Sequence, residues 1–423
     1  MSSTLTTNKV EGFVSHIAEN NLAVWNELKS IRQSGLKAIK SLKFPTTRDE
    51  YWKYSRTTKI TKNHYHFSQL DSIKGDLSKV KIEGLDTYEI VMVNGFFNAE
   101  LSSLPKNDII EIKSFEECTT EELTSYFSQN LDTITNFFSA LNTAYFSEGI
   151  MIVAKGVCDK PVHVIHYSEG NNVISQPRNL FITEKNAELS IIKSSINQNT
   201  ENFFYNSVNE FFIGENSHMN YYVIQNYEEG MNVISTNVAT QEKNSNFSAY
   251  NYTLKGDWIR NNTNIFVKGE NCESNLYGAY QPKGKQHIDN HTIMDHIMPN
   301  CESNEHYKGT VDDKATGVFN GKVFVRKDAQ KINAFQSNNN ILLSDDATMN
   351  SKPELEIYAD DVKCSHGSTS GQLDEEAVFY LQSRGLSKES ATALLIGAFL
   401  GEVVEKIKLP ELKDKVLEMY GME

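Results

Sequence analysis

Cysteine, positive charge and long apolar runs are scarce in this chain of 423 residues. Its five cysteines include no Cys-x-x-Cys pair, which argues against a disulfide framework and against a closed four-cysteine zinc site. With 41 Lys and Arg against 55 Asp and Glu, the net charge is −14, and such an acidic surface repels nucleic-acid phosphate and anionic lipid. No apolar run approaches the ~18 residues of a membrane span, and no secretory signal is visible. We therefore expect a cytoplasmic protein that binds neither nucleic acid nor membranes.

Proline is also rare, and asparagine is concentrated in one part of the chain. The whole sequence has 8 prolines, whereas residues 171–350 alone contain 31 asparagines, against 11 in residues 1–170 and none in 351–423. Asparagine tolerates left-handed backbone and hydrogen-bonds its own main chain, so it favours tight turns. The middle of the chain is therefore expected to contain many turns within folded structure rather than a flexible linker.

Short β-rich segments alternate with polar turns through residues 149–372. One small residue follows each of several turns, and successive small residues are 30, 28, 27, 29, 14, 14 and 18 positions apart. These spacings cluster near 14 and its double, and a fixed period of short strands predicts a solenoid, most simply a parallel β-helix. The small residues are Ala187, Ser217, Ser245, Cys272, Cys301, Ala315, Ala329 and Ala347.

Helical periodicity flanks this region on both sides. Helices are expected over residues 11–41 and 119–145, the second beginning with a capped Thr119, and a strand and turn over 88–97 lies between them. At the other end, Asp374 and Ser387 can cap two helices and Pro410 fits the first turn of a third. The expected fold is mainly β, with a largely helical N-terminal region (1–148), a parallel β-helix core (149–372) and a C-terminal helical region (373–423).

Most chemistry-bearing patterns have a structural alternative. Residues 278–285 and 317–322 contain Gly and Lys but lack the spacing of a phosphate-binding loop. In a strand, His287, Asp289 and His291 share one face and could bind a metal, or form a ladder of polar side chains with neighbouring coils. His296 and His306 follow in the same stretch.

Two further patterns, a pair of cysteines and several paired aspartates, also have more than one interpretation. Cys272 and Cys301 occur in the same string, Asn-Cys-Glu-Ser-Asn, and are expected to stack as small residues or to act together. Paired aspartates resemble the carboxylate sets of β-helical lyases and hydrolases, or are simply turn residues. The alternative function is therefore a stand-alone β-helix enzyme that uses these Asp and His groups. The pairs are Asp312-Asp313, Asp345-Asp346 and Asp360-Asp361.

Cys364 and His366 form a more specific pair near the end of the β-rich region. They are two residues apart, so on a strand they share a face, and Gly367 beside them allows another backbone to approach. A thiolate and an imidazole suit iron–sulfur or transition-metal chemistry. Two ligands do not complete a metal site, so the others would come from another chain or from labile sulfide.

Residues 352–371 and 373–386 closely resemble the C-terminal signature of the SufB/SufD family, scaffold subunits of the Suf iron–sulfur cluster assembly system. Residues 306–309, 317–322, 329–331 and 334–336 fit the family pattern, and 45–54 is similar to its N-terminal motif. Where SufB members usually read Glu-His-Glu-Ala, this chain has Ser365, His366, Gly367 and Ser368. That feature and the chain length resemble the SufD branch.

The resemblance implies a right-handed β-helix that forms a heterodimer with a SufB-like subunit. It implies that a nascent iron–sulfur cluster forms at their interface, shared between the subunits, with His366 as a ligand and Cys364 as a nearby thiol. It also implies a SufC-like ABC ATPase on the C-terminal helices, so that this chain is not an enzyme and binds no nucleotide. A homodimer of the isolated chain is a further option. The expected ATPase-docking residues are Leu394, Leu395, Phe399, Glu402 and Val403.

Overall fold

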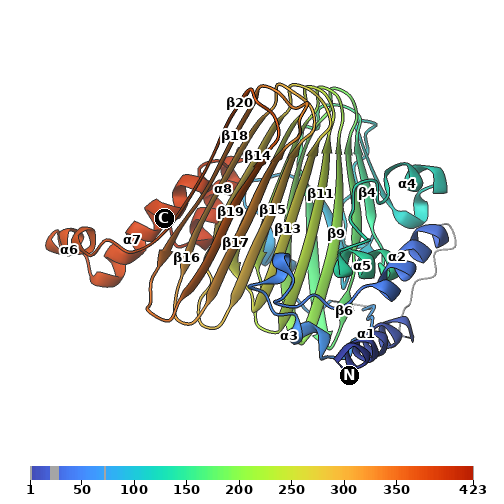
Figure 1. The fold of residues 1–423 in the computed structure, drawn as a ribbon, viewed down its shortest axis with the longest axis horizontal. Coiled ribbons are helices and arrows are strands. Elements are labelled where there is room, and N and C mark those ends of the chain that lie inside the picture. The colour runs from blue at the N-terminus through green and yellow to red at the C-terminus, as the bar shows by residue number, and fades with distance from the viewer. Residues whose placement is uncertain (1, 20–27, 71–72, 423) are drawn as a thin grey trace.

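The computed structural model describes residues 2–19, 28–70 and 73–422, and two facing sheets dominate it (Figure 1). The first sheet has the order β2-β1-β5-β8-β10-β12-β14-β16-β18-β20, and the second β19-β17-β15-β13-β11-β9-β7-β4-β3, with β6 beside β9. From β4 onward the pairings are parallel and successive long strands alternate between the sheets, so each pair of strands forms one coil. This is the parallel β-helix that the repeat predicts.

The first sheet contains β1 (Tyr88–Val93), β2 (Phe96–Asn98), β5 (Val162–Asn171), β8 (Glu188–Glu201), β10 (His218–Asn226), β12 (Asn246–Lys255), β14 (Glu273–Tyr280), β16 (Glu302–Val311), β18 (Ile332–Leu342) and β20 (Val362–Gln372). The second contains β3 (Ile110–Ser114), β4 (Ile150–Ala154), β6 (Ile174–Ser175), β7 (Arg178–Thr183), β9 (Phe203–Ile213), β11 (Met231–Gln241), β13 (Trp258–Val267), β15 (His287–His296), β17 (Thr316–Val325) and β19 (Thr348–Ile357).

An asparagine with left-handed backbone stands at the same corner of five successive coils. In Asn216 and Asn244, for example, φ is 57°, and Asn244 Nδ2 donates to Asn216 Oδ1 at 2.8 Å. The residue after each of these asparagines is small and buried, because the chain turns inward there. The corner thus explains both the asparagine enrichment and part of the small-residue repeat. The five corners are Asn186-Ala187, Asn216-Ser217, Asn244-Ser245, Asn271-Cys272 and Asn300-Cys301.

The N-terminal helices lie at one end of the stack (Figure 1). Within the helical stretch expected over 11–41 the structure has α1 (Ser2–Glu19) and α2 (Lys29–Ser41), and α2 begins after Leu28, whose φ is −102° and ψ 17°. Residues 20–27 of that prediction lie outside the described residues. The helix expected over 119–145 is likewise divided into α4 (Thr120–Tyr126) and α5 (Phe137–Tyr145). Short turns η1 (Glu50–Trp52), α3 (Thr58–Thr61), η2 (Leu77–Val80) and η3 (Phe115–Glu117) complete the region.

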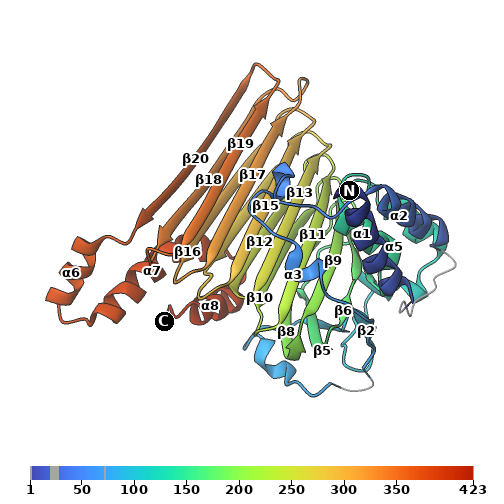
Figure 2. The ribbon, with the colours of Figure 1, turned by 60° about the horizontal axis from the view of Figure 1, so that its bottom comes forward.

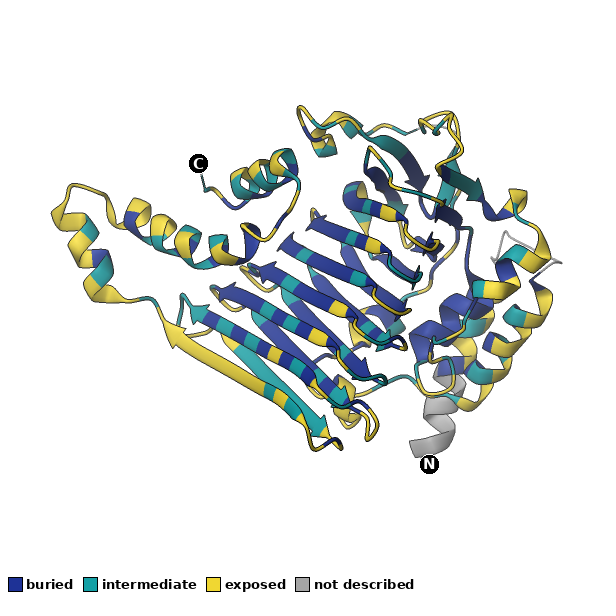
Figure 3. Ribbon diagram, turned by 90° about the horizontal axis from the view of Figure 1, so that it is seen from above, coloured by how far each residue is buried: buried dark blue, intermediate teal, exposed yellow. Residues whose placement is uncertain are grey.

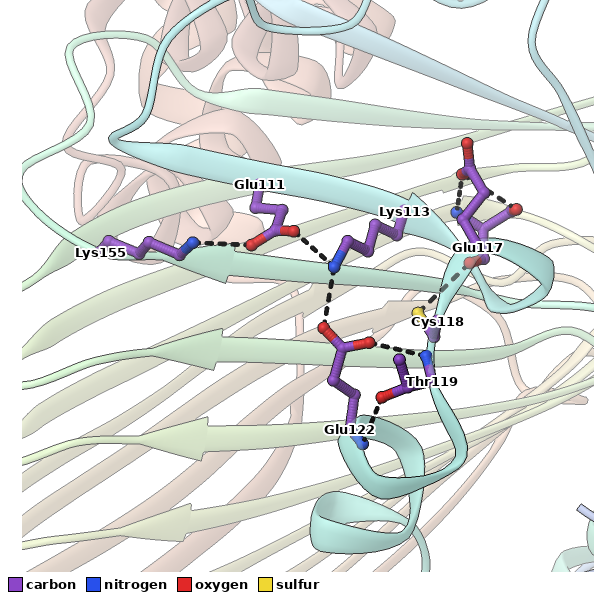
Figure 4. A network of polar contacts seen from close by, with 8 residues as sticks. Glu111, Lys113, Glu117, Cys118, Thr119, Glu122 and Lys155 are labelled. Carbon is purple, nitrogen blue, oxygen red and sulfur yellow. Dashed lines mark hydrogen bonds and ion pairs between the residues drawn. The ribbon is translucent and has the colours of Figure 1, made fainter. Parts of the chain in front are cut away.

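The predicted cap at the start of α4 is present and belongs to a larger polar network (Figure 4). Glu122 N donates to Thr119 Oγ1 at 3.2 Å, and Thr119 N donates to Glu122 Oε2 at 2.7 Å. Lys113 on β3 reaches the other oxygen of Glu122 at 2.8 Å. The hydrogen bond from Lys113 lowers the pKa of Glu122 to about 2. The network fastens α4 to the edge of the second sheet.

Three C-terminal helices begin where the sequence predicts: α6 (Glu375–Ser383), α7 (Lys388–Val404) and α8 (Pro410–Met419). Asp374 and Ser387 accept hydrogen bonds from the first backbone N–H groups of α6 and α7. The end of α7 and α8 pack on the outer face of the first sheet, whereas α6 and the start of α7 extend away from it (Figure 2). In the part of the chain that the structure describes, no helix is long and apolar enough to cross a membrane.

Candidate functional site

The C-terminal end of the β-helix is open. Strands β19 and β20 are the last strands of their sheets, so no further coil stacks on them. Nearly all of β20 is exposed, and it stands out as the exposed strand at one end of the stack (Figure 3). We call the coil formed by β19 and β20 the open end. Side chains at positions that are buried between the sheets in earlier coils are exposed to solvent on β20.

Cys364 and His366 belong to the inward-facing row of β20. Val362 and Cys364 pack against the apolar core, and the hydroxyl of Ser368 donates to Ser351 Oγ on the opposite sheet at 2.7 Å. Because side chains alternate along a strand, His366 lies in the same row, between Cys364 and Ser368. The two residues therefore share a face, as their spacing predicts. Burial raises the pKa of the Cys364 thiol, which lies half-buried, while His366 is exposed.

A buried polar pair lies beneath His366. Gln336 on β18 is in register with His366, and Glu305 on β16 is in register with Gln336. Gln336 Nε2 donates to Glu305 Oε2 at 2.6 Å, and both side chains are buried. Burial raises the pKa of Glu305 to about 7, although the hydrogen bond from Gln336 opposes the shift. The sequence reasoning missed this pair, because only the register shows that three residues 30 positions apart form one column.

The open end does not by itself complete a metal site. Among residues 2–19, 28–70 and 73–422, no group of three or more His, Cys, Asp or Glu side chains could hold a metal ion.

The predicted face of His287, Asp289 and His291 exists but is occupied by the N-terminal segment. Ser55 Oγ lies 2.7 Å from His287 Nε2 and also donates to Asp289, while Arg260 Nη1 contacts Asp289 Oδ2 at 2.8 Å. Burial alone would raise the pKa of Asp289, but His291 and Arg260 beside it hold that pKa below its usual range. Asp289 and His291 are buried, His287 is partly buried, and all of these contacts are to protein side chains, which supports the polar-ladder interpretation.

The remaining histidines are not gathered with this face. His296 bonds Ser303 inside the β-helix, with 2.9 Å between His296 Nε2 and Ser303 Oγ. His306 is only partly buried, and both Glu402 and Lys308 influence its pKa, which burial lowers. The fold therefore separates His296 and His306 from the face that His287 and His291 share.

The cysteine and aspartate patterns have structural roles here. Cys272 N donates to Cys301 Sγ at 3.4 Å, so the two residues stack at adjacent corners, as expected of small residues in the repeat. Asp313 has left-handed backbone with φ 53°, and the members of the other aspartate pairs lie in exposed turns.

The C-terminal helices carry a small apolar surface that differs in part from the predicted one. Leu394 is 54% exposed, whereas Leu395 and Phe399 are half-buried. Glu402 is bound to Lys308 on β16. The expectation that Val403 lies on this surface is wrong, because its side chain is fully buried and its carbonyl accepts from Tyr252 Oη at 3.2 Å.

The C-terminal helical region also exposes aromatic residues that the sequence reasoning did not select. Phe379 and Tyr380 on α6 are 73% and 56% exposed, and Leu386 follows between α6 and α7. We call Phe379, Tyr380, Leu386 and Leu394 the helical patch. The signal in the sequence was the adjacent Phe379-Tyr380 in a helix otherwise rich in polar residues.

A β-helix with an open end, a Cys-x-His pair in its last coil and an exposed C-terminal helical arm defines a class of assembly scaffold. Family models match the chain over almost its full length: the SufBD core domain of SUF-system FeS cluster assembly over residues 166–399, and the SufBD protein N-terminal region over 12–164. The chain belongs to the SufBD family of iron–sulfur cluster assembly proteins, which confirms the family that its motifs indicated.

Full-length relatives support this assignment. The chain is 31% identical to an iron–sulfur cluster assembly SufBD family protein of Synechocystis, across 91% of this chain and 88% of the relative. It is 26% identical to the iron–sulfur cluster assembly protein SufD of Escherichia coli, across 92% and 91%. It is also 27% identical to a chloroplastic Arabidopsis thaliana protein, ABCI7, across 92% and 84%.

We expect Glu305→Gln to change stability in a pH-dependent way. The pKa of Glu305 is about 7 in the folded protein against an ordinary value of 4.5. As the pH rises from 4.5 to about 7, Glu305 ionises in the unfolded chain before it ionises in the folded protein. The free energy of unfolding of the wild type therefore falls by on the order of 3 kcal/mol. The variant lacks this charge. Calorimetry should therefore give it the higher Tm near pH 8 and no such advantage near pH 4.

The exposed Glu302 on the same strand provides the control, and Glu302→Gln should show no comparable pH-dependent gain. If the difference in Tm between Glu305→Gln and wild type were the same at both pH values, Glu305 would not be a buried group that ionises near neutrality.

Proposed function

We propose that the chain is a non-catalytic, SufD-type scaffold subunit on whose open end an iron–sulfur cluster is assembled, with the cytoplasm as its compartment. The observation that carries the proposal is the position of Cys364 and His366, in the inward row of the last coil. A soft thiolate and an imidazole suit iron–sulfur chemistry. The cluster is cargo, and His366 is its proposed ligand, with Cys364 as the nearby thiol.

A second β-helix is the proposed partner at the open end. β19 and β20 are 10 and 11 residues long, and each leaves one row of backbone N–H and C=O groups without a neighbouring strand. Long exposed edges of this kind favour pairing with another chain. A SufB-like subunit that continues both sheets would cover them and bring further cluster ligands next to His366. A second copy of this chain is the alternative partner when the chain is isolated.

The C-terminal helices are the proposed docking site of a SufC-like ABC ATPase. The helical patch lies on the extended arm of α6 and α7, and the Lys308–Glu402 ion pair and the buried Val403 fasten the other end of α7 to the first sheet. An ATPase that moves the arm would therefore transmit force to the β-helix near the open end. The nucleotide would be bound by that partner.

The alternative of a stand-alone β-helix enzyme receives little support from the geometry. Asp289 and His291 are buried and His287 is partly buried, and Ser55 and Arg260 already bond this group, so a substrate would have to displace contacts made by the protein itself.

His366→Ala should lose most of the cluster without loss of fold. We would co-express the tagged chain with a SufB-like subunit and a SufC-like ATPase, purify the complex and measure iron and sulfide per complex. Lys363→Ala, an exposed and outward-facing change on the same strand, is the matched control and should load normally. Full loading of His366→Ala in an intact complex would exclude His366 as a cluster ligand.

Leu394→Asp should weaken ATPase binding, because it places a charge in the centre of an apolar contact. Co-purification should yield at least tenfold less ATPase while the SufB-like subunit is retained. Val403→Asp distinguishes docking from folding: a buried charge there should lower Tm, whereas Leu394→Asp should leave it nearly unchanged. Equal ATPase recovery with wild type and Leu394→Asp would place the docking site elsewhere.

A further inference from the structure

The column of side chains beneath His366 has a role that the proposed function leaves unassigned. Glu305, Gln336 and His366 occupy the same register position on β16, β18 and β20. Leu276, the next residue down the column, is fully buried in the apolar core, so the column faces the inside of the β-helix. Neighbouring strands lie about 4.8 Å apart, which puts the Gln336 side chain within reach of the His366 ring.

Gln336 is held in one orientation. Its Nε2 donates to Glu305 Oε2 at 2.6 Å, and that oxygen can accept from the amide whether the Glu305 carboxyl is ionised or carries its proton on the other oxygen. The side chain is 3% exposed, and Gly321 on the opposite sheet makes room for it: a Cβ at Gly321 would stand 2.4 Å from Gln336 Nε2. The fold thus provides both an anchor and a space for this amide.

The other end of the amide is unsatisfied. Gln336 Oε1 is buried and has no hydrogen-bond partner among the described residues. A buried acceptor without a partner is costly, and such atoms in native proteins usually have a functional or assembly-dependent explanation. The adjacent residue in the column is His366, whose ring carries an N–H donor in either neutral tautomer.

We propose that Gln336, anchored by Glu305, is a positioning residue for the cluster ligand His366. In the assembled complex Gln336 Oε1 accepts a hydrogen bond from one ring N–H of His366 and thereby directs the other ring nitrogen at the cluster. Metal-binding histidines commonly donate their second N–H to an oxygen acceptor, which fixes the tautomer and the ring orientation. This inference rests on the proposed role of His366 as a ligand.

The test uses the complex of the chain with its SufB-like and SufC-like partners. Gln336→Met removes the amide with little change in shape. Gln225→Met is the matched control, because Gln225 is also a buried glutamine of the first sheet but lies on β10, four strands from β18. We expect iron loading to fall about tenfold in Gln336→Met and to stay near wild type in the control.

Pulsed EPR of the reduced cluster provides the readout that a merely structural role would not change. The ¹⁴N coupling of the His366 ring should be altered in Gln336→Met and unchanged in Gln225→Met. Gly321→Ala, which crowds the amide from the opposite sheet, should alter the same coupling and serves if Gln336→Met does not fold.

The outcomes separate this inference from the function on which it rests. If His366→Ala loses the cluster while Gln336→Met matches Gln225→Met in loading and in ¹⁴N coupling, the positioning role is overturned and the scaffold function stands. If His366→Ala loads fully, both are overturned. Reduced loading with an altered coupling in Gln336→Met, while Gln225→Met is unchanged in both, supports the proposal.

Discussion

In-register stacking of the coils is the constraint on which the rest of this structure depends. Each residue of a coil stands about 4.8 Å from its equivalent in the next, so a residue type that solves a local problem can be repeated along the stack. The left-handed asparagine at the corner and the small buried residue after it recur in five successive coils. The same constraint means that the stack ends abruptly. The inward row simply continues into the last coil, where nothing covers it.

The edge strands at the two ends of the β-helix differ in length and direction. At the N-terminal end the edges are β2 and β3, which are antiparallel and only 3 and 5 residues long. Short edge strands resist pairing with other chains. At the other end the edges are long and parallel. The helices that follow β20 could have covered them, yet α7 and α8 pack on the outer face of the first sheet, where Tyr420 Oη donates to Ala279 O at 2.8 Å. These helices therefore leave the edges of the coil that carries Cys364 and His366 uncovered.

Much of this could be predicted from the sequence, because repetition leaves a strong signal. The spacing of Ala187, Ser217 and Ser245 indicated the β-helix, and the capping residues Asp374 and Ser387 marked the C-terminal helices. The two-residue spacing of Cys364 and His366 correctly put them on one face. Other features depend on contacts between distant segments. Nothing local to His287 or Asp289 shows that Ser55 occupies their face, and nothing local to Gln336 shows that it stands between Glu305 and His366. Val403 was misjudged because an apolar stripe on a helix does not reveal which of its edges is covered.

The central claim is that the open end is the surface on which a partner completes the site. Hydrogen–deuterium exchange of the chain, alone and with a SufB-like subunit, tests it most directly. We expect the amides of β19 and β20 to exchange rapidly in the isolated monomer, and slowly only if the chain pairs with itself there. In the heterodimer the same amides should be strongly protected, while the exchange of β2 and β3 is unaffected. The claim would be contradicted if a stable heterodimer formed and protected amides elsewhere, while the amides of β19 and β20 still exchanged rapidly.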